Sequence, residues 1–499
     1  MTRSRAVVLQ AWMPTILLAG LVTAMGLTIA LLPWQWALLL VLMPAAAMVL
    51  LIRPQLALCL LAFSVPFGLI REWPLGPVNV GLAELLLVAL VVSWAAKAMS
   101  QRRLVIPRPP LLVPLITLLA AFSISTLAAG SLALSAKELV KWLEVLVIYL
   151  FMAAEVDRSW GKWIVLSLLA AGSIEALFGV YQFFWRAGPE GFVLFGRFMR
   201  SYGHFAQPNP FAGYLGLVVP LAYALGLQAA HVWSRTVARA LTKLPEMLFG
   251  FVGMSAYWTA AAVMSTAIFM SWSRGAWIGA AAALVVVTIV RSQKALMALL
   301  VAAILAAYAL GAGGAEYLPS SLAERFTGLL PYVSGVDVTR IDINDANWAV
   351  IERTAHWLAA IGMFADHPWI GVGIGNYPVA YSGYALGRWR DPLGHAHNYY
   401  LNVAAEAGLV GLFAYGVLFA AAVVQAWRGA RRSAAEAGEE AVSGYWQAVA
   451  VGGLGVLVHL SVHSLFDSLY VHSMNVQLGL VLGLVAIAQR GTHSDAHRV

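Results

Sequence analysis

The chain has 499 residues, of which 61% are hydrophobic and 11% are charged, and its mean hydropathy is +0.79. This composition excludes a soluble globular protein, which needs far more charge to cover its surface. The net charge of +8 does not call for a nucleic-acid partner, because the basic residues are dispersed between apolar segments. The single cysteine, Cys59, excludes an intrachain disulfide.

Apolar runs of about 16 to 25 residues, the length that crosses a bilayer core, recur down the whole chain. We therefore predict an all-α polytopic membrane protein with about 12–14 transmembrane helices. The first run follows Arg3 and Arg5 as in a signal peptide, but it is too long for one and has no clear cleavage site. The predicted spans are Ala6–Leu31, Trp34–Ile52, Gln55–Ile70, Val80–Ala98, Leu111–Ala128, Leu139–Ala154, Trp163–Trp185, Phe211–Ala230, Leu248–Met270, Ala276–Val290, Ala295–Gly311, Asn398–Trp427, Tyr445–Leu465 and Tyr470–Gln489.

The basic residues predict the orientation of these spans. When the spans alternate, every connection on one side is basic, so that side is cytoplasmic and holds both termini. Three regions result: residues 1–312 with the first eleven spans, a long outward loop over residues 313–395, and residues 396–499 with the last spans and a cytoplasmic tail. A loop of that length indicates a functional segment.

The long loop contains helix and turn signals. Ser321 and Glu324 form a capping box that opens one short helix. A second helix starts near Asn347 and stops near Pro368, and its mixture of apolar and charged residues suits a helix lying on the membrane surface. The glycines from Gly371 to Gly375 do not have the spacing of a dinucleotide fingerprint, so we interpret them as a tight turn.

Several arginines are predicted to lie on the outward side, although basic residues prefer the cytoplasmic side of a membrane. They indicate either an anionic partner or snorkelling to the lipid headgroups. Arg200 opens a turn rich in Gly, Pro and Asn that leads into a helix, whose first N–H groups favour anions. Arg274 lies in a tight hairpin, Ser273-Arg274-Gly275, between two spans. Because the guanidinium fork suits phosphate oxygens, these two arginines predict a diphosphate clamp.

Histidines mark the end of the loop. His395 and His397 have a His-x-His spacing, but with Asp391 they form a poor zinc ligand set, so no metal is predicted. A histidine is suited to remove a proton from a sugar hydroxyl. His459, His463 and Asp467 repeat at i, i+4 and i+8, on one face of the penultimate span near its outer end. This pattern is compatible with four roles: a proton pathway, a metal site, support for the catalytic groups or structural packing.

The stretch from His397 resembles the O-antigen ligase and polymerase superfamily. His397-Asn398, nine intervening residues, Gly408, two residues and Gly411 match its His-Asn/Ser/Gln pattern. Supporting matches are Pro208-Asn209-Pro210, Ser273-Arg274-Gly275 and the residues from Arg353 to Asn376. The resemblance covers the second half of the chain, and the first seven spans resemble the family only in hydropathy.

This resemblance implies a glycosyltransferase of the GT-C type in the bacterial inner membrane. Such enzymes move a glycan from undecaprenyl diphosphate to an acceptor hydroxyl on the periplasmic side, with inversion and without a metal or other cofactor. By matching position, His397 would be the general base, and Arg200 and Arg274 would hold the diphosphate. An O-antigen ligase acting on lipid A core is the first expectation. A polymerase that extends a growing O-antigen or exopolysaccharide is the alternative.

Further side chains are candidates for contact with substrate or for support of the catalytic groups: Arg197, Arg353, Arg388, Arg390, His395, Asn398, Tyr399, Glu406 and His463. A flippase or transporter of lipid-linked glycan is an alternative of another class, since it also needs many spans. It requires a polar path across the bilayer, whereas the polar motifs gather on one face and no internal repeat is visible.

Overall fold

A computed structural model describes most of the chain between residues 33 and 490, together with Gly20, Thr23 and Gly26. The residues not described inside that range are 69–72, 76–77, 104–106, 195, 239–243, 293–295, 432–439 and most of 298–346. The predicted spans Ala6–Leu31 and Ala295–Gly311 lie largely outside the described residues, as does the capping box of Ser321 and Glu324.

Helices make up nearly all of the described secondary structure. Eight of them are long and apolar enough to cross a membrane, and three shorter apolar helices accompany them, within the described residues. The predicted all-α polytopic class is confirmed. The helices are α2 (Trp34–Ile52), α3 (Gln55–Phe67), α4 (Leu82–Ser100), α5 (Leu112–Ser125), α6 (Leu132–Glu155), α7 (Arg158–Trp185), α8 (Pro208–Gly216), α9 (Val219–Ala238), α10 (Leu244–Met270), α11 (Arg274–Arg291), α14 (Trp348–Asp366), α15 (Tyr377–Ala380), α16 (Tyr399–Arg431), α17 (Glu440–His463) and α18 (Met474–Ala488).

The structure departs from the predicted elements in two ways. The predicted span Phe211–Ala230 lies within one candidate membrane span, Pro208–Val237, but it consists of two helices, α8 and α9. Helix α8 starts at Pro208 because proline is pre-organised for the first turn of a helix. Two short antiparallel hairpins, β1–β2 (Trp73–Leu75 with Val78–Val80) and β3–β4 (Val193–Leu194 with Phe198–Met199), were not predicted. Strands of two or three residues carry too little alternation to stand out in a sequence.

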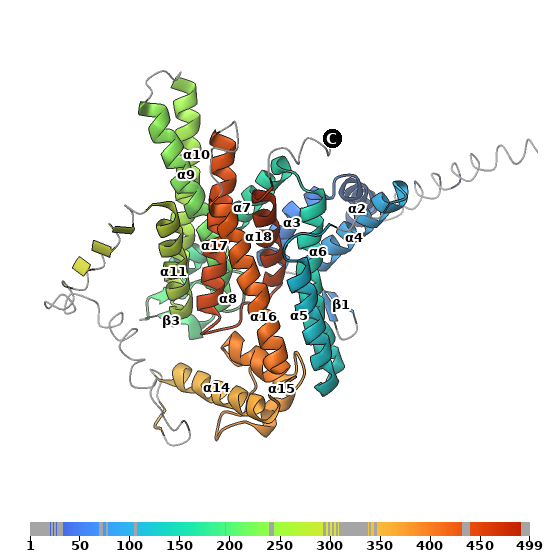
Figure 1. The fold of residues 1–499 in the computed structure, drawn as a ribbon, viewed down its shortest axis with the longest axis vertical. Coiled ribbons are helices and arrows are strands. Elements are labelled where there is room, and N and C mark those ends of the chain that lie inside the picture. The colour runs from blue at the N-terminus through green and yellow to red at the C-terminus, as the bar shows by residue number, and fades with distance from the viewer. Residues whose placement is uncertain are drawn as a thin grey trace, which may run out of the picture. The chain divides into compact units, whose positions relative to one another are not determined.

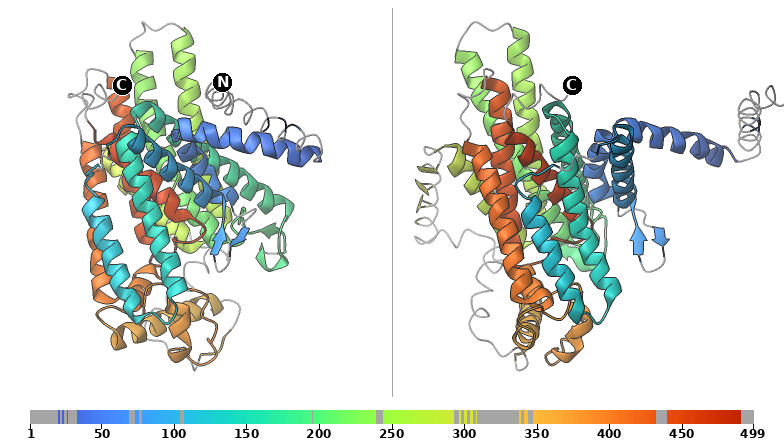
Figure 2. Two further views of the ribbon diagram at one scale, coloured as in Figure 1. Left: turned by 90° about the vertical axis from the view of Figure 1, so that its right-hand side faces the viewer. Right: turned by 45° about the vertical axis from the view of Figure 1, so that its right-hand side comes forward.

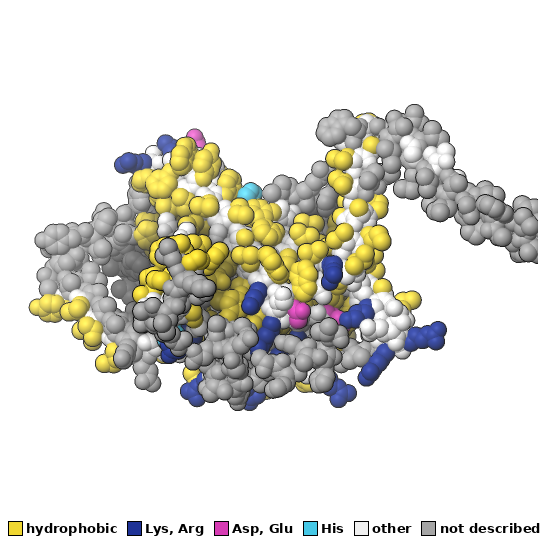
Figure 3. All heavy atoms as spheres, turned by 90° about the horizontal axis from the view of Figure 1, so that it is seen from above, with side chains coloured by type: hydrophobic (Ala, Val, Ile, Leu, Met, Phe, Trp, Pro, Cys, Tyr) yellow, Lys and Arg dark blue, Asp and Glu magenta, His cyan; other side chains and the backbone are white. Residues whose placement is uncertain are grey.

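The chain divides into two compact units. The smaller one comprises Met1–Ala57 and Val88–Arg103, and in it the Ser93 hydroxyl of α4 donates to the Leu51 carbonyl of α2. The larger one comprises Leu58–Leu87 and Leu104–Val499 and contains every candidate site residue. Figure 3 shows hydrophobic side chains over much of the described surface on the face that it presents, as expected where lipid surrounds the helices.

In the larger unit, α14 and α15 gather at one end of the packed helices. Figure 1 shows α14 lying across the lower end of α16, and Figure 2 shows the same arrangement from two further directions. The last turn of α9 and the first turn of α10 lie at the opposite end of this unit (Figure 1). We call the end with α14 and α15 the loop-side end.

Helix α16 breaks at Gly408, whose φ of 61° is not helical. The segment from Pro368 to Gly373 packs into the break. Val372 and Gly373 donate backbone hydrogen bonds to the carbonyls of Ala405 and Glu406, and the amides of residues 409 and 410 donate to those of residues 368 and 369. Gly371, Gly373 and Gly375 all have positive φ, which confirms the predicted tight turn.

Replacing Gly408 by alanine should destabilise the protein. The new Cβ would lie 2.3 Å from the carbonyl carbon of Trp369, in a backbone conformation that side chains rarely adopt. Backbone strain of this kind costs roughly 1–3 kcal/mol, and the steric overlap adds to it. Thermal unfolding in detergent measures the effect. Gly416→Ala is the matched control in the same helix, since open space surrounds that position, and equal melting temperatures for the two variants would contradict the prediction.

Candidate active site

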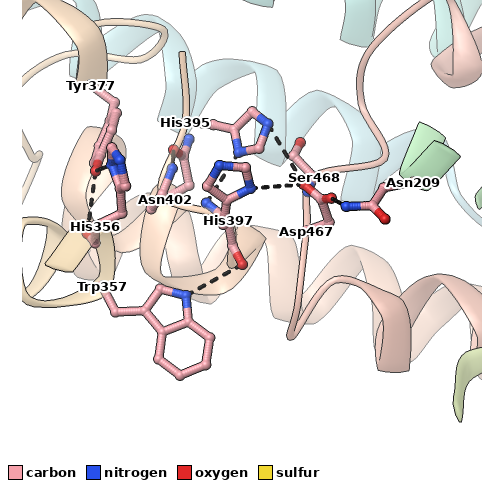
Figure 4. Close-up of polar contacts among 10 residues, drawn as sticks. Asn209, His356, Trp357, Tyr377, His395, His397, Asn402, Asp467 and Ser468 are labelled. Carbon is pink, nitrogen blue, oxygen red and sulfur yellow. Dashed lines mark hydrogen bonds and ion pairs between the residues drawn. The ribbon is translucent and has the colours of Figure 1, made fainter. Parts of the chain in front are cut away.

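His397 lies directly before α16 and is held on three sides (Figure 4). Its ring Nδ1 lies 3.2 Å from Oδ1 of Asp467. Its amide donates to Nδ1 of His395 over 3.1 Å, and its carbonyl accepts from the indole Nε1 of Trp357 over 3.3 Å. Its φ of 52° is uncommon for a residue with a side chain. The local backbone is therefore fixed by tertiary contacts rather than by the preference of the residue.

Asp467 is the partner that orients His397. Its second oxygen, Oδ2, accepts from Nδ2 of Asn209 over 2.9 Å, and Oδ1 also accepts from the amide of Ser468 over 2.9 Å. Burial raises the pKa of Asp467, but the hydrogen bond from His397 and the nearby charges, including Arg353, outweigh it and hold this pKa well below its usual range. A permanent carboxylate keeps the proton of neutral His397 on Nδ1.

The position of Asp467 corrects the predicted helical face. Helix α17 ends at His463, so only His459 and His463 share a face, and their rings are in contact through Nε2 and Nδ1 at 3.4 Å. Asp467 follows in the connection to α18, where its amide bonds to the His463 carbonyl. The carboxylate is thereby directed toward His397 and His395 instead of along the helix.

With Nδ1 committed to Asp467, the Nε2 atom of His397 carries a lone pair. Within the described part of the chain, no hydrogen bond engages this Nε2, and the His397 side chain is 18% exposed. His356 lies edge-on to the His397 ring at 5.7 Å between centroids, and burial together with His397 lowers the pKa of His356 to about 4. His397 thus presents a ring nitrogen, on a side chain backed by a carboxylate, at an accessible position.

The spacing of His395, His397 and Asp467 would suit a metal ion, because their ligand atoms lie within 4.8 Å of one another. The donor chemistry does not fit one. Nδ1 of His395 accepts the His397 amide, so a neutral His395 ring carries its proton on Nε2, the atom 3.7 Å from Asp467. Burial lowers the pKa of His395 to about 4, so its ring is neutral. A metal would need a lone pair on that same Nε2.

Three arginines lie close enough together for their charges to interact: Arg200, Arg274 and Arg353, here called the arginine cluster. Burial, then the charges of Arg353 and Arg274, lower the pKa of Arg200 to about 10. Nε of Arg353 is buried without a hydrogen-bond partner among the described residues. The charge of Arg353 also acts on Asp467 and on His395, so the cluster borders the histidines.

Backbone contacts explain how two distant segments of sequence bring Arg200 beside Arg274. Nε of Arg200 donates to the Ser271 carbonyl over 2.9 Å, and the Ser201 amide donates to the Met270 carbonyl over 3.1 Å. The turn that carries Arg200 is therefore docked on the hairpin that leads into Arg274. The two predicted phosphate ligands converge, and Arg353 of α14 joins them.

Helix α7 holds the turn that carries Arg200 in place through hydrogen bonds. The buried carboxylate of Glu175 accepts from both the amide and the ring Nδ1 of His204, each over 2.7 Å. Gln182 accepts from the Gly203 amide over 2.7 Å, and the Ser201 hydroxyl donates to a carbonyl of α7. Sequence reasoning missed these residues, although an acidic residue inside an apolar span is a signal of functional use.

Other candidates do not belong to the cluster. Arg197, Arg388 and Arg390 are exposed. The guanidinium carbon of Arg197 lies 5.1 Å from the centre of the Phe198 ring, and that of Arg388 lies 5.6 Å from the Trp348 ring. Stacking on aromatic rings is a structural use of arginine.

The remaining candidates support the local fold. Asn398 accepts from the Leu401 amide over 3.1 Å and so caps the start of α16. Tyr399 is buried beside the Tyr470 ring, 4.3 Å away. The Glu406 carboxylate accepts from the Tyr377 amide over 2.9 Å, which fastens α15 to α16. His463 is buried against His459.

The family model of O-antigen ligase matches residues 259–416, a range that includes Arg274, Arg353 and His397. Arg200 and Asp467 lie outside the matched range. A search of curated proteins gave no match to the chain. Residues 259–416 of this multi-pass membrane protein are therefore similar to the O-antigen ligase family.

Proposed function

We propose that the protein is a glycosyltransferase on the periplasmic face of the bacterial inner membrane. It transfers a glycan from undecaprenyl diphosphate to an acceptor hydroxyl, as an O-antigen ligase whose acceptor is lipid A core. The observation that carries this proposal is the free Nε2 of His397, backed by Asp467, beside an arginine cluster with three positive charges. A base next to a polyanion site is what transfer from a glycosyl diphosphate requires.

The reaction follows from these groups. The arginine cluster binds the diphosphate of the donor and neutralises the charge that develops as it leaves. Nε2 of His397 removes the proton of the acceptor hydroxyl, whose oxygen attacks the anomeric carbon opposite the diphosphate and inverts its configuration. The bond from the anomeric carbon to the diphosphate oxygen breaks, and its electron pair leaves with undecaprenyl diphosphate. Asp467 stabilises the imidazolium that forms on His397.

The charge distribution supports a periplasmic location for the loop-side end. Arg158 at the start of α7 bonds to the carbonyl of Arg490 beyond α18, and Arg428 and Arg431 lie in the last turn of α16. These residues are at helix ends remote from His397, which agrees with a cytoplasmic side rich in positive charge. The loop region 313–395 then contributes Arg353 to the site, so it belongs to the active centre as well as to the connection.

A reconstituted transfer reaction tests the proposal. Purified protein should join glycan from undecaprenyl diphosphate to lipid A core in the presence of a metal chelator, and gel electrophoresis of the glycolipid reads the product. Lengthened lipid-linked glycan instead would identify a polymerase of the same superfamily. Absence of both products with an active donor preparation, or a requirement for added metal, would contradict the mechanism.

A further inference from the structure

We propose that the groove between α7 and α10 holds the polyprenyl chain of the lipid-linked donor. This inference rests on the proposed function, because it assigns a place to the part of the donor that the arginine cluster does not bind. It adds a binding site within the membrane spans, distinct from the polar groups at the loop-side end.

The groove has a volume of about 470 Å³. It is lined by Ser173 and Leu177 of α7 and by one face of α10, from Phe251 to Val263. Small residues form the hollow of that face, namely Ser255, Ala256, Thr259 and Ala260. Both helices are candidate membrane spans, so the groove opens toward lipid rather than toward water.

Apolar lining alone would not single out this groove, because every membrane helix has an apolar surface. What distinguishes it is that both of its helices end at the arginine cluster. Helix α10 ends at Met270, whose carbonyl binds Ser201, next to the Arg200 side chain, and Arg274 follows four residues later. The last turns of α7 hold the same Arg200 turn through Gln182.

The chain therefore has an apolar groove on the pair of helices whose ends contact the turn that carries Arg200. Val263 precedes Met270 by seven residues, which is about two helical turns or roughly 10 Å. A donor whose diphosphate binds the arginines can extend its first isoprene units down this face. The acyl chain of an ordinary phospholipid fits the groove equally well, but a phospholipid lacks the diphosphate charge that would bind the arginine cluster.

A second groove provides a matched control. It lies between α5 and α16, has a volume of about 440 Å³, and is lined by Thr117, Ala120, Phe413 and neighbouring apolar residues together with Trp369. Its size and lining resemble those of the first groove, but among the described residues no hydrogen bond joins α5 or α16 to the turn that carries Arg200. Filling it should leave recognition of the donor lipid unchanged.

The experiment measures binding of undecaprenyl diphosphate and of farnesyl diphosphate to purified protein, so it does not depend on transfer activity. Wild type should bind the long-chain probe at least tenfold more tightly than the short one. Ala256→Trp, at an exposed position in the groove between α7 and α10, should reduce that preference at least fivefold while farnesyl diphosphate binding stays within twofold. Ala260→Phe is the second variant, and Ala120→Trp in the other groove should keep the wild-type preference.

Three outcomes would overturn the inference. The first is equal affinity of wild type for the two probes. The second is an equal loss of affinity for both probes in Ala256→Trp and Ala260→Phe. The third is a loss of the preference for the long-chain probe in Ala120→Trp but not in Ala256→Trp. The first outcome would mean that ordinary lipid fills the groove between α7 and α10. None of them bears on glycan transfer, so a failure of the proposed function is recognised separately by absent product in the reconstituted reaction.

Discussion

Replacing His397 by alanine should lower the turnover of glycan transfer by about 10²–10⁴-fold, the usual contribution of a general base. The donor KM should change little, because the proposed diphosphate site is the arginine cluster and not the imidazole. Transfer rates at saturating donor, measured on purified variants, give the effect. Added imidazole should restore part of the rate in His397→Ala, since the free Nε2 position is then open to an external base.

His367→Ala is the control for this result, because His367 is an exposed histidine at the end of α14 and no interaction found among the described residues joins it to His397. Asp467→Asn should also slow turnover, by less than His397→Ala, since the amide keeps the shape of the side chain but loses the charge that fixes the His397 tautomer. Full transfer activity in His397→Ala would refute the catalytic assignment.

Replacing Arg353 by methionine should lower kcat/KM for the donor by about 10²–10³-fold, as when one preorganised group that stabilises transition-state charge is removed. Its Nε is buried without a partner among the described residues, beside two further arginines, so this charge is costly in the absence of an anion. The same substitution should therefore not lower the melting temperature of the protein without donor. A drop in activity combined with unchanged thermal stability separates ligand binding from a structural role.

Two other arginine variants sharpen this prediction. Arg353→Lys should recover only part of the activity, because lysine lacks the planar fork that binds two phosphate oxygens at once. Arg388→Ala should stay within twofold of wild type, since Arg388 is exposed and lies over Trp348 outside the cluster. If Arg388→Ala and Arg353→Met reduced activity equally, a diffuse positive surface would explain donor binding better than the cluster does.

Hydropathy was sufficient to predict most of the fold. Apolar runs of bilayer length are forced to be helical, because lipid offers no partner for free backbone groups. The sequence could not predict that the span from Phe211 would be divided at Leu217 and Val218, since both flanking segments are equally apolar. It could not predict the break at Gly408 either, because the groups that occupy the break come from Pro368 to Gly373, far away in the chain.

The sequence predicted which residues belong to the candidate site better than it predicted which of them contact one another. His397, Arg200 and Arg274 were chosen from motifs, and the structure brings the two arginines together. Asp391 was expected beside the histidines, but Asp467 is the carboxylate that bonds to His397, from 70 residues further along. Helical periodicity assigned Asp467 to a face of α17 because it cannot show that the helix ends at His463. Arg353 was only a secondary candidate, whereas Arg200 was assigned to the diphosphate clamp, because the sequence around Arg353 in α14 does not indicate which residues it contacts.

The break in α16 also constrains how the protein assembles during its synthesis. Four backbone hydrogen bonds at the break are made by Pro368 to Gly373, residues that emerge from the ribosome before α16 does. In a bilayer, unpaired backbone groups cost several kcal/mol each, so the part of α16 around Gly408 is stable only once this preceding segment has docked on it. In the proposed orientation, the long loop must therefore cross the membrane before α16 reaches its final packing, and His397, which precedes α16, reaches its final position after that step.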